Sequence, residues 1–484
     1  MALPYTSLLL PLLLCFFQSH YTAAASSSPN QPLLIHLSHT SSHSASPTFP
    51  SQSHLLKSSS LRSTSRFLSR HRRQQLSLPL AAGSDYTLSL SISSTTVSMY
   101  LDTGSDLLWF PCSPFECILC ENKPSFPLSS PPPPTPPSSN PLPCSSFLCS
   151  AAHSFLASSD LCAASHCPLD AIETSSCSPY SSPCPLLYYA YGDGSLLASL
   201  RRGSLSLPGL SLTNFTFACA HSALAEPVGV AGFGRGSLSL PTQLAKLSPF
   251  LASRFSYCLI SHSFLSHRLR RPSPLILGRS SSSSFTYTPL LRNPINHFFY
   301  SVALLSLSVG HVTLQASPKL SAVDKYGAGG MVVDSGTTFT MLPGDTHRRL
   351  TAEFGRQMER RGFVGAPGAE ERTGLGPCYE YGNESKDRRR VPALGLHFAG
   401  NASLWLPTRN YFLGFESEGE RVGCLMLMSA GDEEWEKEDA GGGPAGTLGN
   451  FQQQGMEVVY DVEMGRVGFA RRRCGELWDS VSHG

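Results

Sequence analysis

The chain has 484 residues, of which 41% are hydrophobic and 14% are charged. This apolar share excludes a wholly disordered chain, because it provides enough material for a large core. The 36 Lys and Arg residues nearly balance 34 Asp and Glu residues, which leaves a formal net charge of +2. We therefore expect no nucleic-acid partner, since proteins that bind nucleic acids carry a clear basic excess.

Residues 1–24 have the pattern of a secretory signal peptide. An apolar run from Leu8 to Phe17 precedes three small residues at 23–25, as in a signal-peptide core followed by a cleavage site. The run is too short for a bilayer, which takes about 20 residues to span, and the polar C-terminal end lacks the tail of a lipid-anchor signal. We expect a secreted, extracellular protein (apoplast or cell wall) without a membrane anchor; the vacuole is the open alternative.

Residues 25–79 are rich in Ser and basic, and no Asp or Glu occurs before Asp85. Residues 80–484 retain 30 basic against 34 acidic residues, a net charge of −4. Two interpretations of residues 25–79 stay open: a disordered tail, or a pro-segment whose cations cover an acidic site until it is removed. Five of these cations lie close together, namely Arg62, Arg66, Arg70, Arg72 and Arg73.

Cysteines and glycosylation motifs agree with secretion. Setting aside Cys15 of the signal peptide leaves 14 cysteines, and an even number in a secreted chain indicates disulfide bonds. Nine lie in residues 112–184 beside a run of prolines, so we expect an irregular surface insertion without core strands. No metal site is expected, because the pair Cys117 and Cys120 has no second pair to complete a zinc site. The Asn-x-Ser/Thr motifs predict glycosylated surface positions at Asn214, Asn383 and Asn401.

An apolar strand that ends in an Asp-hydroxyl-Gly triplet occurs twice in the chain. The triplets begin at Asp102 and Asp334, 232 positions apart, and no third Asp-Ser/Thr-Gly exists. An alternating segment precedes each one, at 86–92 and 300–309, and predicts a strand. An apolar glycine element follows each triplet further along the chain. The chain therefore contains an internal repeat.

This repeat predicts two homologous lobes of normal domain size, an N-terminal lobe of residues 80–290 and a C-terminal lobe of residues 291–484. Short segments of period two dominate both halves, so we expect an all-β protein. The best candidate helix runs from Leu350 to Arg361, after Thr346.

Two aspartates at strand ends in a duplicated frame predict a catalytic site. The glycine of each triplet permits a tight turn, and the hydroxyl can hold the loop by hydrogen bonds. Two carboxylates at hydrogen-bonding separation share one proton and titrate as a pair. The ionised member can take a proton from a bound water while the protonated member polarises an amide carbonyl. Asp102 and Asp334 are therefore the candidate catalytic pair, for peptide-bond hydrolysis without a metal or other cofactor.

These motifs also resemble a known family. The sequence from Asp102 to Trp109 (DTGSDLLW) and that from Asp334 to Thr337 (DSGT) are similar to the two active-site motifs of pepsin-like aspartic proteases, family A1. Residues 188–195 (YYAYGDGS) resemble the flap hairpin of that family. The cysteine-rich insertion and the segments 232–241 and 449–452 resemble its plant, nepenthesin-like branch. The resemblance implies an all-β, bilobed pepsin-like fold, with a catalytic cleft between two β-barrel-like lobes.

The resemblance also implies roles for the residues around the catalytic pair. The supporting residues would be Thr103, Gly104, Ser105, Ser335, Gly336 and Thr337. Among them, Thr103 and Ser335 would lock the two loops together, and Ser105 and Thr337 would hydrogen-bond the carboxylates from outside. The flap, with substrate beneath it, would present Tyr191, Gly192 and Asp193, with Trp109 as the hydrogen-bond partner of the tyrosine.

By the same resemblance, Cys219 would pair with Cys474 and Cys378 with Cys424. Cys258 would then pair with the insertion or stay free. The arginines of residues 25–79 would pair with acidic groups near neutral pH, and acid would release them by protonating those groups.

The expected activity is that of a secreted, monomeric aspartic endopeptidase that hydrolyses protein or peptide substrates at acidic pH. The main alternative is a catalytically inactive binding protein of the same fold, an inhibitor of enzymes that degrade cell-wall polysaccharides. A third alternative, a carbohydrate-active enzyme with two carboxylates, would leave the hydroxyl and glycine neighbours of both aspartates unexplained.

Overall fold

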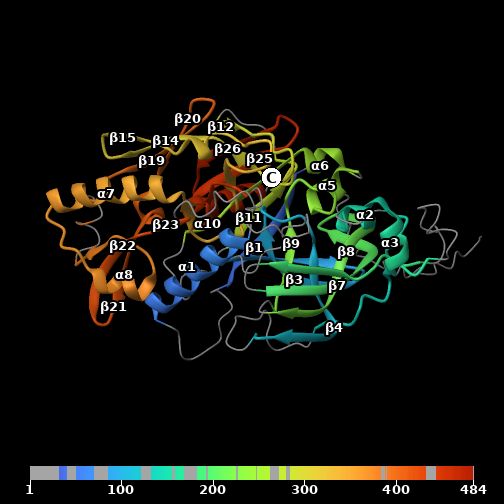
Figure 1. Ribbon diagram of the computed structural model, residues 1–484. Helices are drawn as coiled ribbons and strands as arrows, with labels where there is room; N and C mark the ends of the chain where they lie inside the picture. The colour runs from blue at the N-terminus through green and yellow to red at the C-terminus, as the bar shows by residue number, and fades with distance from the viewer. Residues whose placement is uncertain are drawn as a thin grey trace, which may run out of the picture.

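A computed structural model of the chain describes residues 32–40, 51–69, 85–120, 132–154, 158–167, 182–191, 194–224, 227–246, 248–261, 272–279, 284–382, 387, 390–431 and 443–482. The predicted signal peptide, Gly192, Asp193 and Asn383 lie outside these residues. The architecture is mostly β, in two lobes, as predicted (Figure 1). Among the described residues, no helix is long and apolar enough to cross a membrane.

The N-terminal half of the chain forms eleven of the described strands. They are β1 (Leu33–His39), β2 (Tyr86–Ile92), β3 (Thr95–Asp102), β4 (Trp109–Ile118), β5 (Asn140–Pro141), β6 (Leu187–Tyr191), β7 (Gly194–Leu207), β8 (Leu210–Leu224), β9 (Gly229–Gly232), β10 (Arg254–Cys258) and β11 (Ser273–Leu277). Alternating apolar and polar residues favour strands such as β1, which buries Leu33, Ile35 and Leu37 on one face. Strands β9 and β11 are instead buried at every position.

The C-terminal half forms the remaining described strands. They are β12 (Thr286–Pro289), β13 (Ser301–Val302), β14 (Leu304–Val309), β15 (Val312–Gln315), β16 (Met331–Val333), β17 (Thr340–Leu342), β18 (Cys378–Glu380), β19 (Leu394–Phe398), β20 (Ala402–Leu406), β21 (Phe412–Ser417), β22 (Glu420–Leu425), β23 (Leu427–Ser429), β24 (Gly446–Leu448), β25 (Met456–Asp461) and β26 (Arg466–Arg471). One large sheet joins the two lobes, in the order β12-β26-β25-β10-β11-β1-β2-β3-β9-β4-β8-β7-β5. Three smaller sheets complete the C-terminal lobe.

The helices of the described residues lie mostly at the edges of these sheets. They are α1 (Gln52–Ser69), α2 (Phe147–Ala152), α3 (Ser158–Ala164), α5 (Leu240–Ala245), α6 (Pro249–Ser253), α7 (Gly344–Arg360), α8 (Pro367–Thr373), α10 (Asn450–Gln453) and α11 (Cys474–Ser482). The predicted helix is α7, which begins earlier than expected, at Gly344. It buries Leu350, Phe354 and Met358 along one face.

The insertion at 112–184 is less irregular than predicted. Strand β4 continues into it as far as Ile118, and it also holds β5, α2 and α3. Helix α2 forms because Ser146 caps it by accepting a hydrogen bond from the N–H of Leu148. The expectation that this segment contributes no strand to the lobe is therefore wrong for its first residues and for β5, which pairs with β7.

The disulfides correct one predicted pairing. Cys219 pairs with Cys112 and Cys474 pairs with Cys258. The expected Cys219–Cys474 bond is therefore wrong, and so is the expectation that Cys258 pairs with the insertion or stays free. Cys219 on β8 lies beside β4, which carries Cys112, whereas Cys474 starts α11 next to the end of β10. Cys378 pairs with Cys424, as the resemblance implied, across the neighbouring strands β18 and β22. Two further disulfides join Cys117 to Cys120 and Cys149 to Cys184.

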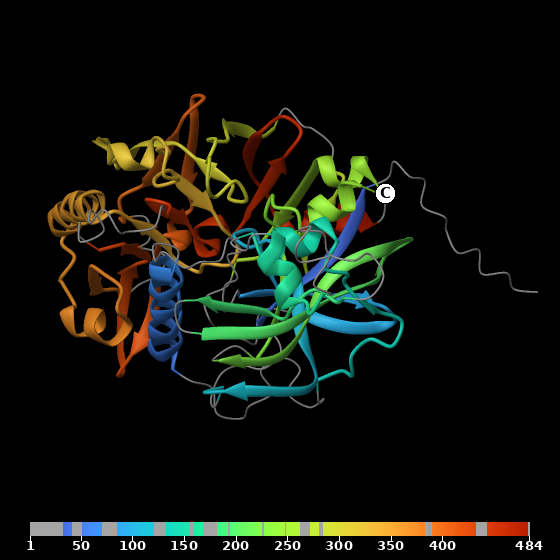
Figure 2. The same cartoon turned by 45° about the vertical axis from the view of Figure 1, so that its right-hand side comes forward.

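Part of the basic segment is folded against the rest of the protein. Strand β1 pairs with β11 and β2 inside the large sheet, and α1 lies between the two lobes, against the C-terminal lobe (Figures 1 and 2). Leu56 of α1 packs in a cluster with Phe339 and Phe451, and Phe67 packs with Met341. The interpretation as a disordered tail is wrong for β1 and α1.

Candidate active site

The two Asp triplets occupy equivalent places in the two lobes. Asp102 ends β3, which pairs in parallel with β9, and Asp334 directly follows β16, which pairs in parallel with β24. A glycine near the end of each partner strand allows the close approach. A Cβ on Gly232 would lie 2.6 Å from backbone atoms of the first loop, and one on Gly449 would lie 2.5 Å from the carbonyl oxygen of Thr338. The sequence repeat is therefore a repeat of structure as well.

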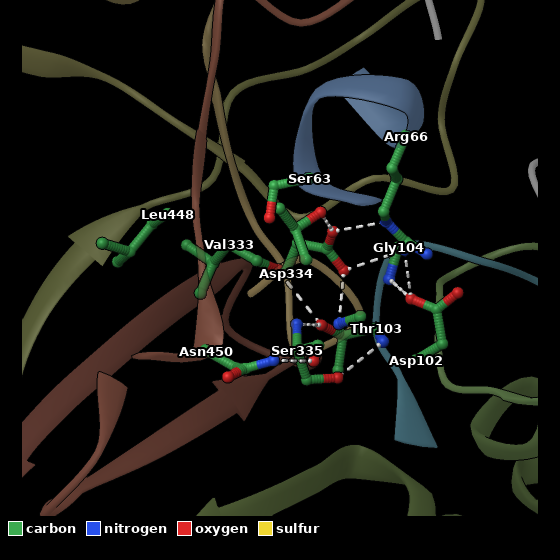
Figure 3. Close-up of polar contacts among 12 residues, drawn as sticks. Ser63, Arg66, Asp102, Thr103, Gly104, Val333, Asp334, Ser335, Leu448 and Asn450 are labelled. Atoms are coloured by element: carbon green, nitrogen blue, oxygen red, sulfur yellow. Dashed lines mark hydrogen bonds and ion pairs between the residues drawn. The ribbon is translucent and has the colours of Figure 1, made fainter. Parts of the chain in front are cut away.

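Hydrogen bonds join the two loops reciprocally (Figure 3). The N–H of Thr103 donates to the Ser335 hydroxyl over 3.0 Å, and the N–H of Ser335 donates to the Thr103 hydroxyl over 2.9 Å. The two hydroxyls in turn donate to the carbonyl oxygens of Val333 and Leu101. Both side chains are fully buried, so this network holds the loops in one relative position.

Each carboxyl group is held by its own loop. The N–H of Gly104 donates to Asp102 Oδ1 and that of Gly336 donates to Asp334 Oδ1, both over 2.9 Å. The Thr337 hydroxyl also donates to Asp334 Oδ2. The equivalent Ser105 hydroxyl has no hydrogen-bond partner among the described residues, so its expected bond to Asp102 is not made in this state.

The two carboxyl groups lie close together. A Cβ on Gly336 would come within 2.4 Å of Asp102 Oδ1, so a glycine is needed at this position for the loops to approach. The exposed fractions of Asp102 and Asp334 are 1% and 0%. The site is therefore a buried pair of carboxyl groups contributed by both lobes.

The side chain of Arg66, from helix α1, reaches both carboxyl groups (Figure 3). Its Nη2 lies 2.5 Å from Asp102 Oδ1 and 3.1 Å from Asp334 Oδ1, and its Nε lies 3.0 Å from Asp334 Oδ2. Burial opposes the positive charge, but the two carboxylates outweigh burial and raise the pKa of Arg66. Sequence reasoning placed Arg66 in a basic cluster without separating it from its neighbours.

A second ion pair joins α1 to the start of the N-terminal lobe. Arg62 Nη2 lies 3.3 Å from Asp85 Oδ1. The other oxygen of Asp85 accepts a hydrogen bond from Asn450 Nδ2, which also donates to the carbonyl oxygen of Ser335. Asp85 is therefore linked both to helix α1 and to the loop that carries Asp334.

Sequence reasoning missed a layer of side chains beneath the two loops. The hydroxyl of Tyr460 donates to Thr103 Oγ1 and the carbonyl oxygen of Val333, both over 3.3 Å, and it shares a 2.8 Å hydrogen bond with Tyr257. Burial raises the pKa of both tyrosines, so they remain neutral supports. Gln453 donates to the carbonyl oxygen of Asp334. The segment 449–452, which directly precedes Gln453, resembled the plant branch of the family. The sequence did not show that this region contacts the loops of the two aspartates.

The flap residues are only partly placed. Tyr191 ends β6, which forms a hairpin with β7. Its side chain lies outside the described residues, as do Gly192 and Asp193. Trp109 starts β4 and is buried, and its indole nitrogen has no hydrogen-bond partner within the described part of the chain. The expected bond between Trp109 and Tyr191 therefore stays a prediction.

The donor groups of the described residues do not favour a metal site. Ligand atoms of Cys149, His153 and Cys184 lie close together. The two cysteines are joined by a disulfide, so neither sulfur is available as the thiolate that binds zinc.

Two lobes that contribute matching Asp-Ser/Thr-Gly loops to one buried pair define the pepsin-like class of aspartic proteases. The family model described as xylanase inhibitor N-terminal matches residues 86–279, and the one described as xylanase inhibitor C-terminal matches residues 299–471. A probable aspartyl protease from Arabidopsis thaliana is 53% identical over 96% of this chain and 97% of its own length. Aspartic proteinase nepenthesin-1 from Nepenthes gracilis is 30% identical over 82% of this chain and 79% of its own length. The chain belongs to the plant, nepenthesin-like branch of the aspartic protease family.

Solved structures with the same fold are more distant in sequence. The crystal structure of edgp has a TM-score of 0.61 and 16% identity, and covers 93% of this chain and 97% of its own. Basic 7S globulin from soybean has a TM-score of 0.56 and 17% identity, over 91% of this chain and 97% of its own. At these identities the likeness shows the fold alone.

Proposed function

We propose that this protein is an aspartic endopeptidase, in which Asp102 and Asp334 activate one water molecule for attack on a peptide bond. The observation that supports this most directly is the position of Arg66 Nη2, within 3.1 Å of an oxygen of each carboxyl group. One small donor reaches both groups, so a water molecule in its place could do the same.

The mechanism follows from this arrangement. One carboxylate takes a proton from the bound water, while the carboxyl group that holds the shared proton hydrogen-bonds the amide carbonyl. The N–H groups of Gly104 and Gly336 keep one oxygen of each aspartate oriented. The lock between Thr103 and Ser335 keeps the two carboxyl groups at one separation, so little reorganisation is needed during the reaction.

We further propose that the described chain is a zymogen. Helix α1 occupies the space between the lobes, and Arg66 takes the place of the water and substrate. Acid would protonate the carboxyl groups, remove the partners of Arg66 and free α1 for cleavage. We also propose that the protein is secreted, which the signal-peptide pattern supports. Asn214 and Asn401 are exposed, and we propose that both are glycosylated.

A binding function is the second candidate, because both matching family models are described as xylanase inhibitor domains. In that case the protein would bind a polysaccharide-degrading enzyme and cleave nothing. Unlike an inhibitor without a catalytic site, this chain retains both aspartates and the reciprocal lock.

The two candidates are separated by one experiment on the purified full chain. After acidification and removal of the pro-segment, we expect cleavage of a denatured protein substrate at acidic pH, blocked by a statine transition-state inhibitor. Asp102→Asn and Asp334→Asn should each abolish it, while Asp345→Asn, in an exposed pair with Arg349, should not. No cleavage by wild type between about pH 2 and 7, with inhibition of a xylanase instead, would establish the binding function.

A further inference from the structure

Asp106 is a buried carboxyl group that the mechanism above does not use. It lies in the loop between β3 and β4, just after the first catalytic triplet, and 2% of its surface is exposed. Its Oδ1 accepts a hydrogen bond from the N–H of Gly236, 2.8 Å away, in the loop that follows β9. Asp106 therefore connects the first catalytic loop to a second loop of the same lobe.

The loop after β9 is shaped around this carboxyl group. A Cβ on Gly236 would lie 1.4 Å from Asp106 Oδ2, and one on Gly234 would lie 2.4 Å from Oδ1. Neither glycine has a positive φ, so the space taken by Asp106, and not the backbone conformation, requires them. An acid and two glycines form one packed unit.

This unit is fastened directly to the catalytic loop. The N–H of Phe233 donates to the carbonyl oxygen of Asp102 over 2.7 Å, and that of Gly234 donates to the carbonyl oxygen of Ser105 over 2.8 Å. The hydroxyl of Tyr300 donates to the carbonyl oxygens of Phe233 and Gly234 from the other side. A movement of Asp106 would therefore be transmitted to the backbone of Asp102.

Three ionisable groups among the described residues face Asp106: Asp102 on β3, Arg235 between the two glycines, and Tyr300 before β13. Burial raises the pKa of Asp106 to about 7; the N–H of Gly236 lowers it, the charge of Asp102 raises it, and Arg235 lowers it. Burial also raises the pKa of Tyr300 well above its usual value, so that hydroxyl stays neutral. Arg235 is thus the one cation in this set that stabilises an ionised Asp106.

We propose that Asp106 is a positioning residue for Asp102, which holds the first catalytic loop through its packing against Gly234 and Gly236 and its hydrogen bond from the N–H of Gly236. A buried carboxyl group fills this space at least cost when it is neutral, so we expect the hold to be firmer at acidic pH than at neutral pH. The effect on catalysis rests on the proposed protease function. The effect on stability does not, because it follows from the packing of Asp106 alone.

The direction of the stability effect follows from proton linkage. The folded chain holds this proton more tightly than the unfolded chain, because the folded-state pKa is raised. The stabilisation is therefore complete below the ordinary pKa of 3.8, and it is lost progressively as the pH rises from there to about 7. Removing the ionisation should make the protein more stable at neutral pH, which is unusual for a substitution at a buried polar residue.

The test compares thermal unfolding of the full chain at pH 4.5 and pH 7.5, with Asp334→Asn present in every sample so that no chain can process itself at acidic pH. Wild type in this test means the chain that keeps Asp106 in this background. Asp106→Asn keeps the shape and the acceptor oxygen but cannot ionise. The melting temperature of wild type should fall from pH 4.5 to pH 7.5. We expect the fall for Asp106→Asn to be smaller than that for wild type by at least about 3 °C. Glu463→Gln, at an exposed carboxylate, removes the same charge and should follow the wild-type curve. Asp106→Ala loses the acceptor as well and should be less stable than wild type at pH 4.5.

The activity of the processed enzyme at pH 4.5 gives the second measurement. We expect Asp106→Asn to retain kcat within about threefold and Asp106→Ala to lose tenfold or more, with little change in KM, since positioning acts on the reacting carboxyl group. Parallel melting curves for Asp106→Asn and wild type would overturn the proposal, and so would equal kcat values for the Asn and Ala variants. An inactive wild type would refute the protease function and leave the melting test decisive.

Discussion

Replacing Arg66 by Met in the full chain removes the cation that α1 places between Asp102 and Asp334. Arg66 makes three hydrogen bonds to the two carboxyl groups and is buried with them. Removing one partner of such a buried pair costs about 3–5 kcal/mol. At about 1.4 kcal/mol per tenfold change, the fraction of molecules with α1 displaced should rise about 100- to 4,000-fold.

The assay follows self-processing of the purified full chain by gel electrophoresis across a pH series, together with binding of a statine inhibitor at neutral pH. We expect Arg66→Met to process at higher pH than wild type and to bind the inhibitor at least about 100-fold more tightly, by the same arithmetic. Lys57→Met is the matched control, because Lys57 lies on the exposed side of α1 and donates to the carbonyl oxygen of Glu371, away from both aspartates. The same processing profile for Arg66→Met and wild type would refute the role of Arg66 in latency.

Three further predictions concern the framework of the site. Thr103→Val removes one hydroxyl of the lock between Thr103 and Ser335 and should lower the free energy of unfolding by about 1–3 kcal/mol and abolish most of the activity. Ser335→Thr keeps the hydroxyl and should retain both stability and activity. Equal losses in the two variants would contradict the role of the lock. Gly449→Ala places a methyl group 2.5 Å from a carbonyl oxygen and should lower the yield of folded protein, measured by circular dichroism; a normal melting curve would argue against close packing there. Mass spectrometry of unreduced peptides should find Cys258 joined to Cys474, and a Cys219–Cys474 peptide would overturn that assignment.

Much of the fold could be predicted from the sequence, because its signals are local. Alternation of apolar and polar residues identified strands such as β2, and the recurrence of an apolar strand with an Asp-hydroxyl-Gly triplet indicated two lobes. The segment from Leu350 to Arg361 was predicted as a helix and corresponds to most of α7. Such patterns are visible in sequence because a strand or helix buries one face with a fixed period.

Other features depended on contacts between distant segments. The disulfide between Cys258 and Cys474 spans 216 positions. The sequence alone does not show whether Cys219 or Cys258 is the partner of Cys474. The insertion appeared irregular because its prolines and cysteines obscured the continuation of β4. The sequence gives no local signal for the role of Asp106, since its burial against Gly234 and Gly236 depends on residues about 130 positions away.

The sequence by itself determined that this chain carries a duplicated Asp-hydroxyl-Gly frame and a basic segment ahead of a slightly acidic body. These are properties of composition and spacing, which need no knowledge of the fold. Only the tertiary structure decided that one arginine of that segment, Arg66, lies between the two aspartates, and that Asp106 fills the space left by two glycines. In the sequence, Arg62, Arg66 and Arg70 look alike, because they have the same charge and lie close together in the same basic segment. Only the packing of α1 against the C-terminal lobe brings Arg66 to Asp102 and Asp334.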